Sequence, residues 1–302
     1  MTNPRIAVVG STNIDLIAYT ARIPGPGETI EGDRFQMGFG GKGANQAVMA
    51  RILGADVSMV NCLGDDPYGS MTLDNFAERG IDTTHVHRVP GSSGVAPIWV
   101  EPDGTNRIII IPGANHRLTR QQAIEAIRDI EPTVVLGQFE IPQEVTAAGF
   151  REARSRGATT ILNPAPAAPI TDELLAECDW IVPNEVEFSL LFERPATDDA
   201  LIEVAGRLDR RLAVTLGSEG CALVVEGSVH RIPAPEVTPV DTTGAGDAFV
   251  GAFAYGLATG LDERKAAALG NACAADSVTR PGTQSSFAGG EEAQRILAGI
   301  TR

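Results

Sequence analysis

The residues best suited to chemistry lie in one short segment, Asp241-Thr242-Thr243-Gly244-Ala245-Gly246-Asp247, directly before an apolar stretch at 248–257 that is predicted to be helical. Gly244 and Gly246 allow the main chain to turn its N–H groups toward a ligand, and the positive end of the helix dipole points the same way. The segment is therefore a candidate anion hole. Asp247 stands at the helix start, where a carboxylate often serves only as an N-cap. Beside an anion hole it can instead accept the proton of a hydroxyl that attacks a phosphoryl group, and the local sequence leaves both roles open.

A second glycine-rich segment, Gly38-Phe39-Gly40-Gly41-Lys42-Gly43, matches the pattern G-x-G-x-x-G. A dinucleotide-binding fold is disfavoured, because that pattern should directly follow the first strand and here it comes much later. A Walker loop is excluded, because Gly43 follows Lys42 where Ser or Thr is required. What remains is a glycine turn that feeds a helix at 44–53, with Lys42 and Asn45 near its start. Main-chain N–H groups, an ammonium and an amide would then converge on an oxygen-rich ligand, unless the turn is only a tight strand–helix connection.

Two further segments lie where predicted strands end. Asn184 and Glu187 follow a predicted strand at 180–182 and have the spacing of a capping box. The same carboxylate could instead orient a magnesium-bound phosphate through water. The segment 215–220, Thr-Leu-Gly-Ser-Glu-Gly, is a glycine turn that could hold a nucleotide through main-chain contacts.

The acidic composition limits the partners that this chain can have. Its 302 residues carry 24 Lys and Arg against 39 Asp and Glu, a formal net charge of −15. Such a chain is a poor partner for nucleic acid or an anionic membrane, so we predict neither. The four cysteines lie apart among apolar neighbours and are predicted to be free thiols. A strand-like segment follows the first few residues at once and no run of 18 apolar residues occurs, so we expect a cytoplasmic protein.

Strand and helix patterns alternate along most of the chain. Predicted strands are 6–9, 57–62, 133–137, 159–162, 180–182 and 212–216, with a hairpin over 221–232. Predicted helices are 44–53, 68–79, 143–156, 185–192, 199–208, 247–257, 263–278 and 290–298. This alternation predicts an α/β fold, a three-layer sandwich in which helices cover both faces of a central, mostly parallel sheet. We expect one domain over residues 1–302.

Two insertions interrupt this pattern, at about 16–37 and 95–111. They contain strand-like segments at 16–20, 29–37, 95–101 and 107–111, which could pair into a small sheet that covers a ligand, another subunit, or both. Pro97 cannot donate to a ladder, so its strand should be an edge strand or bulged. We place Trp99 and Pro97 on the outer face, and Ala96, Ile98 and Val100 on the face toward the ligand.

Taken in order, the motifs resemble those of the PfkB family of carbohydrate kinases over residues 9–286. They are Gly10-Ser11-Thr12-Asn13-Ile14-Asp15, Gly40-Gly41-Lys42-Gly43-Ala44-Asn45-Gln46-Ala47, Gly113-Ala114-Asn115, Asn163-Pro164-Ala165-Pro166, Asn184-Glu185-Val186-Glu187 and the segment 241–247. Each motif is weak alone, but the ordered set is specific.

The resemblance implies that ATP phosphorylates the primary hydroxyl of a sugar, with D-ribose converted to D-ribose 5-phosphate as the first choice. It implies Asp247 as the base, with Gly244, Ala245 and Gly246 as the anion hole. The implied sugar ligands are Asn13, Asp15, Gly41, Lys42, Asn45, Glu140 and Asp247. The implied nucleotide-side residues are Asn184, Glu187, Thr215, Gly217, Ser218, Gly220 and Asn271, with Glu187 tied to Mg²⁺. A K⁺ site is implied at Asp241, Thr243, Ser277, Arg280, Gly282 and Ser286, several of them through main-chain carbonyls.

The resemblance also implies that the inserted strands form a lid that joins two copies of the chain as a homodimer. Two alternatives stay open. One is a kinase of the same family for another sugar, a sugar acid or a nucleoside; a nucleoside would need an aromatic wall for its base. The other is a non-catalytic sugar- or nucleotide-binding regulator, which the intact Asp247 and glycine turn argue against.

Overall fold

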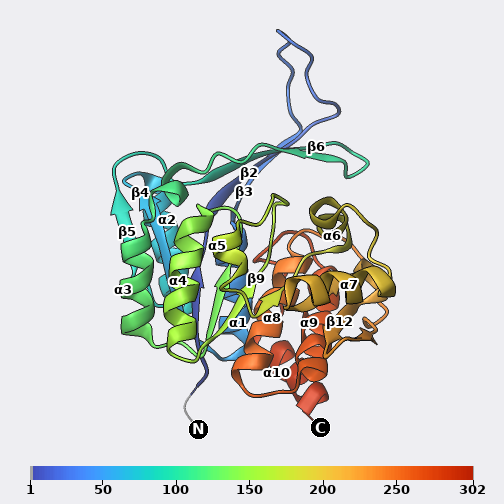
Figure 1. The fold of residues 1–302 in the computed structure, drawn as a ribbon. Helices are drawn as coiled ribbons and strands as arrows, with labels where there is room; N and C mark the ends of the chain where they lie inside the picture. Colours follow the sequence, from blue (N-terminus) through green and yellow to red (C-terminus); the bar gives the residue numbers. More distant parts are fainter. Residues whose placement is uncertain (1–2, 302) are drawn as a thin grey trace.

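The computed structural model describes residues 3–301, and its largest element is a nine-stranded sheet (Figure 1). The strand order is β13-β12-β11-β10-β9-β8-β1-β4-β5, and all neighbours are parallel except β11–β12 and β12–β13. The strands are β1 (Arg5–Val9), β4 (Asp56–Gly64), β5 (Val86–Val89), β8 (Val134–Gly137), β9 (Thr159–Leu162), β10 (Trp180–Ile181), β11 (Arg211–Thr215), β12 (Cys221–Val225) and β13 (Ser228–Ile232). The predicted α/β class and mostly parallel sheet are confirmed.

Helices cover both faces of this sheet, because its central strands are apolar on both sides. In β1, Ile6 and Val8 pack into one core and Ala7 and Val9 into the other. The first core holds side chains from α1 (Lys42–Leu53), α2 (Pro67–Arg79), α8 (Ala245–Ala258), α9 (Glu263–Ser277) and α10 (Gly290–Thr301). The second holds side chains from α3 (Arg120–Ile130), α4 (Gln143–Ser155), α5 (Asp172–Leu175), α6 (Glu185–Phe192) and α7 (Asp198–Leu208). No helix within residues 3–301 combines the length and apolar character needed to cross a membrane.

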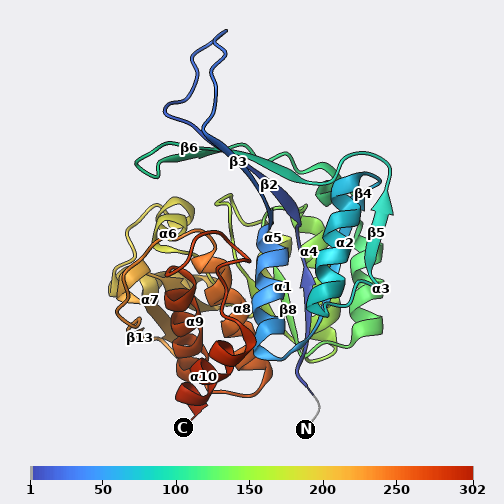
Figure 2. The same ribbon diagram turned by 180° about the vertical axis from the view of Figure 1, so that it is seen from behind.

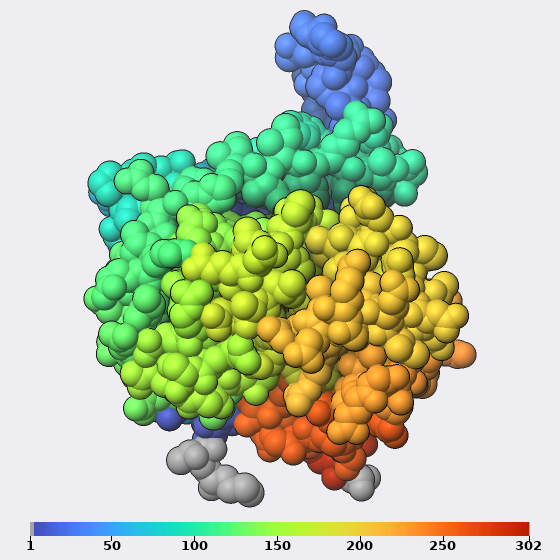
Figure 3. All heavy atoms as spheres, in the orientation of Figure 1, coloured from blue at the N-terminus to red at the C-terminus, as the bar shows by residue number. Residues whose placement is uncertain are grey.

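A separate four-stranded sheet, which we call the lid, lies across one end of this body (Figures 1 and 2). Its order is β3-β2-β6-β7, with β2 (Asn13–Tyr19), β3 (Arg34–Gly40), β6 (Val95–Val100) and β7 (Asn106–Ile108). The connection between β2 and β3 projects from the rest of the molecule (Figure 3). The predicted strand at 29–37 was placed too early. Its partner β2 ends at Tyr19, opposite Arg34, so the residues before Arg34 have no strand to pair with.

The expectation that Pro97 makes its strand an edge or a bulge is wrong. β6 lies between β2 and β7, and one register runs without a bulge from the Trp99–Arg107 pair to the Val95–Ile111 pair. The Ile109 N–H still donates to the Pro97 carbonyl over 3.1 Å, and Val95 and Ile111 exchange both of their bonds. The proline therefore removes one hydrogen bond from the ladder, and regular β7 ends at Ile108.

The lid register separates its two faces as the sequence predicted. Ala96 pairs with Asp15 on one face, whereas Pro97 pairs with Leu16 and Trp99 pairs with Ala18 on the other. Since side chains alternate along a strand, Ala96, Ile98 and Val100 share the face of Asp15. The opposite, outer face is apolar and exposed. Phe35 is 66% exposed, and Met37, Ile109 and Ile111 are also exposed.

The cysteines are free and buried, as predicted. Burial raises the pKa of the Cys62 thiol to about 11, and that of Cys221 and of Cys273 to about 12. These thiols stay protonated near neutral pH, so they are not activated nucleophiles.

Candidate active site

The predicted site residues gather at the carboxyl ends of the central strands, beneath the lid. Glu140 follows β8, Asn163 follows β9, Asn184 follows β10, and Thr215 ends β11. Parallel sheets bind ligands at this edge, where loops leave the strands.

Asp247 does not cap its helix, so the N-cap alternative is wrong. The N-cap of α8 is Gly244, with φ of 81° and no side-chain cap, and Asp247 lies three positions further on. A Cβ atom at Gly244 would lie 2.7 Å from the Thr283 side chain, so both conformation and space require glycine. The first helical bond runs from the Ala248 N–H to the Gly244 carbonyl. The N–H groups of Gly246 and Asp247 therefore have no partner one turn back in α8.

Gly244, Gly246 and Asp247 help to line a small cavity of about 150 Å³. Of the three predicted anion-hole residues, Ala245 is the least available, because its N–H donates to the Thr242 carbonyl over 3.3 Å. An anion in this cavity would meet the amino end of α8.

Two amide side chains from α1 hold the carboxylate of Asp247. Asn45 Nδ2 donates to Oδ2 over 2.8 Å, and Gln46 Nε2 donates to Oδ1 over 3.0 Å. Asp247 is only 7% exposed. Each carboxylate oxygen thus has a fixed donor, which suits a group that must accept a proton at one defined place. Gln46 is a site residue that the sequence analysis did not identify, although an amide next to Asn45 in the same motif is a visible signal.

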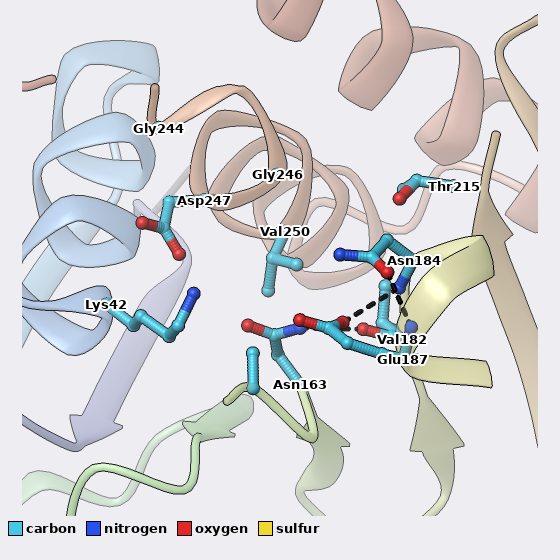
Figure 4. Close-up of a pocket in the computed structure, with 11 residues that line it drawn as sticks. Lys42, Asn163, Val182, Asn184, Glu187, Thr215, Gly244, Gly246, Asp247 and Val250 are labelled. Carbon is cyan, nitrogen blue, oxygen red and sulfur yellow. Dashed lines mark hydrogen bonds between the residues drawn. The ribbon is translucent and has the colours of Figure 1, made fainter. Parts of the chain in front are cut away.

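The Lys42 ammonium faces the same cavity. In Figure 4 its tip lies below Asp247, on the side that faces Asn163 and Glu187. Burial acts to lower the pKa of Lys42, but Asp247, Glu140 and Glu187 more than offset this and raise it. Lys42 therefore stays charged. The sequence grouped it with the sugar ligands, whereas the structure places it beside the nucleotide-side residues.

Several of the residues implied as sugar ligands lie where the lid meets the large sheet. Asn13 Oδ1 accepts from Asn115 Nδ2 over 3.0 Å, so one end of its amide is fixed. Glu140 Oε2 accepts from the Lys42 N–H over 2.9 Å and from the Ser11 hydroxyl. Ser11 is a further contact that the sequence did not identify.

The carboxyl group of Asp15 has a raised pKa. Burial, followed by the nearby charges of Glu140 and Asp247, raises the pKa of its carboxyl to about 7. Close to neutral pH it can therefore donate as well as accept a hydrogen bond. Gly41, whose φ is 88°, caps α1 close to the main chain of Thr12 and Asn13.

A larger groove of about 730 Å³ shares the lining residues Asn184, Thr215 and Gly246 with the small cavity. Predicted nucleotide-side residues line it, together with apolar side chains that include Pro235, Val237 and Phe249. The predicted residues are Asn184, Thr215, Gly217, Ser218, Gly220 and Asn271. The Asn271 amide is engaged with the Ile232 carbonyl over 2.8 Å, so it holds the groove wall.

Asn184 and Glu187 form both halves of a capping box. The structural alternative is thus confirmed for this pair. Glu187 Oε2 accepts from the Asn184 N–H, and Glu187 also lines the small cavity. Burial is the main cause of the raised pKa of Glu187.

The predicted K⁺ residues meet in one group of loops next to the anion hole. Asp241 joins them, since Oδ1 accepts from the Thr243 N–H and Oδ2 from the Gly282 N–H, each over 2.9 Å. Arg280 Nε donates to the Ser286 carbonyl, and the Ser277 hydroxyl donates to the Ala274 carbonyl. Within residues 3–301 no group of three or more His, Cys, Asp or Glu residues is arranged to hold a metal ion.

A candidate anion hole and a carboxylate lie together at the carboxyl edge of an α/β sheet, an arrangement that suits phosphoryl transfer. The chain belongs to the pfkB family of carbohydrate kinases, whose family model matches residues 3–288. It is a carbohydrate kinase.

Named relatives cover nearly the whole chain. It is 40% identical to the deoxyribokinase of Salmonella typhi, with 97% of this chain and 98% of that protein covered. It is 39% identical to the ribokinase of Bacillus subtilis, with 97% and 99% covered. The structure of Arabidopsis thaliana ribokinase complexed with ribose and ATP matches with a TM-score of 0.90 at 30% identity, and 98% and 99% of the two chains are covered.

Proposed function

We propose that this enzyme transfers the γ-phosphoryl group of ATP to the primary hydroxyl of D-ribose and so forms D-ribose 5-phosphate. The observation that carries the proposal is the Asp247 carboxylate, held by Asn45 and Gln46 beside free N–H groups at the α8 amino end. Asp247 accepts the hydroxyl proton, the sugar oxygen bonds to the γ-phosphorus, and the bond from phosphorus to the ADP oxygen breaks. The amino end of α8 and the Lys42 ammonium stabilise the charge on the transferred group.

The larger groove is our proposed ATP site. Its apolar side chains suit a purine base, and its end nearest Gly246 adjoins the small cavity, which suits the phosphates. The ATP-bound Arabidopsis ribokinase supports this choice of nucleotide.

We propose that two cations, Mg²⁺ and K⁺, assist the phosphoryl transfer. Mg²⁺ would be held by phosphate oxygens and water with Glu187 nearby, and it would neutralise phosphate charge. K⁺ would be held by main-chain carbonyls of the loops that Asp241 joins.

The residues expected to bind the phosphoryl acceptor suit a polyol. Asn13, Asp15 and Glu140 bring amide and carboxyl groups to the junction of lid and body, and Ala96 and Ile98 share the Asp15 face. The larger Trp99 lies on the opposite face, so it offers no wall for a nucleoside base. A site built to hydrogen-bond hydroxyls rejects analogues that lack them, by up to about 10⁴-fold.

The second candidate substrate is 2-deoxy-D-ribose, because a deoxyribokinase is as similar to this chain as a ribokinase is. ADP release, measured against a panel of pentoses, hexoses and nucleosides, separates the two. We expect the highest kcat/KM with D-ribose. A higher value for deoxyribose would move the assignment to that sugar, and ADP release with none of the panel would reject the proposal.

The role of Asp247 has its own test. Asp247→Asn keeps the size of the side chain but removes the base. We expect kcat to fall by about 10²- to 10⁴-fold with sugar binding largely retained. Turnover within a few-fold of the unmodified enzyme would reject Asp247 as the base.

We also propose that the lid joins two copies of the chain. Its outer face carries exposed apolar side chains, including Phe35, Met37, Ile109 and Ile111. Such a patch is typical of a protein interface, and two-fold pairing is the commonest arrangement.

A further inference from the structure

A row of buried side chains connects the carboxylate of Asp247 to helix α2. Asn45 Nδ2 donates to Asp247, and Gln284 Nε2 donates to Asn45 Oδ1 over 3.1 Å. Asn75 Nδ2 donates to Gln284 Oε1 over 3.2 Å, and Arg79 Nε donates to Asn75 Oδ1 over 3.0 Å. We call Asn45, Gln284 and Asn75 the amide row.

The two ends of the row fix its direction. An amide side chain can turn over and exchange its donor and acceptor, but a guanidinium has only donors and an ionised carboxylate only acceptors. Arg79 therefore requires the oxygen of Asn75 to face it. Each following amide must then turn its oxygen toward Arg79 and its NH₂ toward Asp247. The orientation of Asn45 at the carboxylate is thus set from α2.

Burial makes a reversed row costly. Asn45 and Gln284 are each 5% exposed and Asn75 is 7% exposed. In such surroundings a polar atom that loses its partner is not compensated by water. Opposite charges at the two ends also polarise the bonds between them in one direction.

We propose that Arg79, Asn75 and Gln284 are positioning residues that act through Asn45 to hold the Asp247 carboxylate ready to accept the hydroxyl proton. The proposal rests on the proposed role of Asp247 as the base. Neither Asn75 nor Arg79 lines the small cavity or the larger groove, so their effect on turnover must pass through the row. Gln46 holds the other carboxylate oxygen independently, so losing the row weakens the positioning without abolishing it.

The main test variant is Asn75→Asp, which changes volume very little. The new carboxylate still accepts from Arg79, but it cannot donate to Gln284 and so favours the reversed row. We expect kcat to fall by about 5- to 30-fold, the effect of one charge-assisted hydrogen bond, with KM for ATP within about twofold. Arg79→Met should act in the same direction, and Arg79→Lys, which keeps a charged donor, should restore part of the loss.

The matched control is Thr72→Val. Thr72 is buried in the same helix, and among residues 3–301 its hydroxyl bonds only the Tyr68 carbonyl. We expect this variant to keep kcat within about twofold, even if it lowers the unfolding temperature.

A double-mutant cycle separates positioning from a structural role. In an Asp247→Asn background, Asn75→Asp should cause less than about a twofold further loss of kcat, because the carboxylate on which the row acts is gone. An equal loss in both backgrounds would overturn the proposal, as would unchanged kcat in both Asn75→Asp and Arg79→Met. High activity of Asp247→Asn alone would overturn the base assignment as well, so the two failures are distinguishable.

Discussion

The main chain of Gly40, at the end of β3, lies against the carboxylate of Asp15 in β2. A Cβ atom at position 40 would lie 2.4 Å from Asp15 Oδ2 and 2.5 Å from Oδ1. Only glycine therefore leaves this carboxylate in its place under the lid.

Gly40→Ala should accordingly weaken sugar binding. The added methyl displaces the Asp15 carboxylate, so we expect KM for the sugar to rise by about 10-fold or more while KM for ATP stays within about twofold. Gly38→Ala is the matched control, since its nearest contact would be the Asp15 Cβ at 4.0 Å. An unchanged KM for the sugar in Gly40→Ala would contradict a role for Asp15 in sugar binding.

The raised pKa of Asp15 predicts a pH-dependent stability. The folded chain holds this proton up to about pH 7, whereas the unfolded chain releases it near 3.8. The folded state thus binds more protons between these values, and the contribution of Asp15 to the free energy of unfolding falls as pH rises through that range. Asp15→Asn removes the effect, so the stability gained over the parent should be larger at pH 8 than at pH 5, by on the order of a few kcal/mol.

Chemical denaturation at the two pH values measures this difference. Glu31→Gln, at an exposed carboxylate in the projecting lid segment, is the control and should show no such trend. The same stability difference at both pH values would argue against a raised pKa at Asp15.

The loops around Asp241 predict activation by a monovalent cation. An ion held there would fix the segment that forms the anion hole, so we expect faster turnover in potassium than in sodium. Asp241→Ala should reduce this difference, because it removes the acceptor that joins the Thr243 and Gly282 N–H groups. Initial rates in matched potassium and sodium buffers measure the effect. Equal rates in the two buffers would contradict a K⁺ site at these loops.

The outer face of the lid predicts a dimer. Phe35→Asp places a charge in the apolar patch and should give a monomer, whereas Trp99→Ala should weaken the dimer more than it weakens sugar binding. Ile202→Ser, at an exposed apolar residue in α7, should leave the assembly unchanged. Sedimentation at micromolar concentration with sugar present is the measurement, and a monomeric parent protein would disprove the proposed interface.

Local patterns predicted the body of the fold well, because its helices and strands end at residues with strong local preferences. Gly54 and Gly80 end α1 and α2 with positive φ, as their positions suggested. Helices α3 and α5 (Asp172–Leu175) and strand β5 were missed. Helix α3 has a complete capping box from Thr119 and Gln122, a local signal that was available. Strand β5 is partly exposed and short, so its apolar pattern is weak.

The site was predictable where motifs are contiguous and not where contacts span the chain. Asn45 and Gln46 stand in a visible motif, but Gln284 reaches Asn45 from 239 residues away. Asn75 lies in a helix with no unusual local pattern. Likewise, whether Pro97 lies in an edge strand depends on whether another strand pairs with the free side of β6. The order in which strands pair cannot be predicted from the sequence of one strand alone.

The division of this enzyme into two sheets has an evolutionary consequence. Asp247 and the α8 turn belong to the large body, whereas Asn13, Asp15 and Ala96 belong to lid strands that enter the chain as two insertions. Substitutions in the lid can therefore change which acceptor is admitted while the phosphoryl-transfer residues keep their packing. The preference for one acceptor over another can therefore change during evolution through substitutions in the lid, while the packing of the catalytic core stays the same.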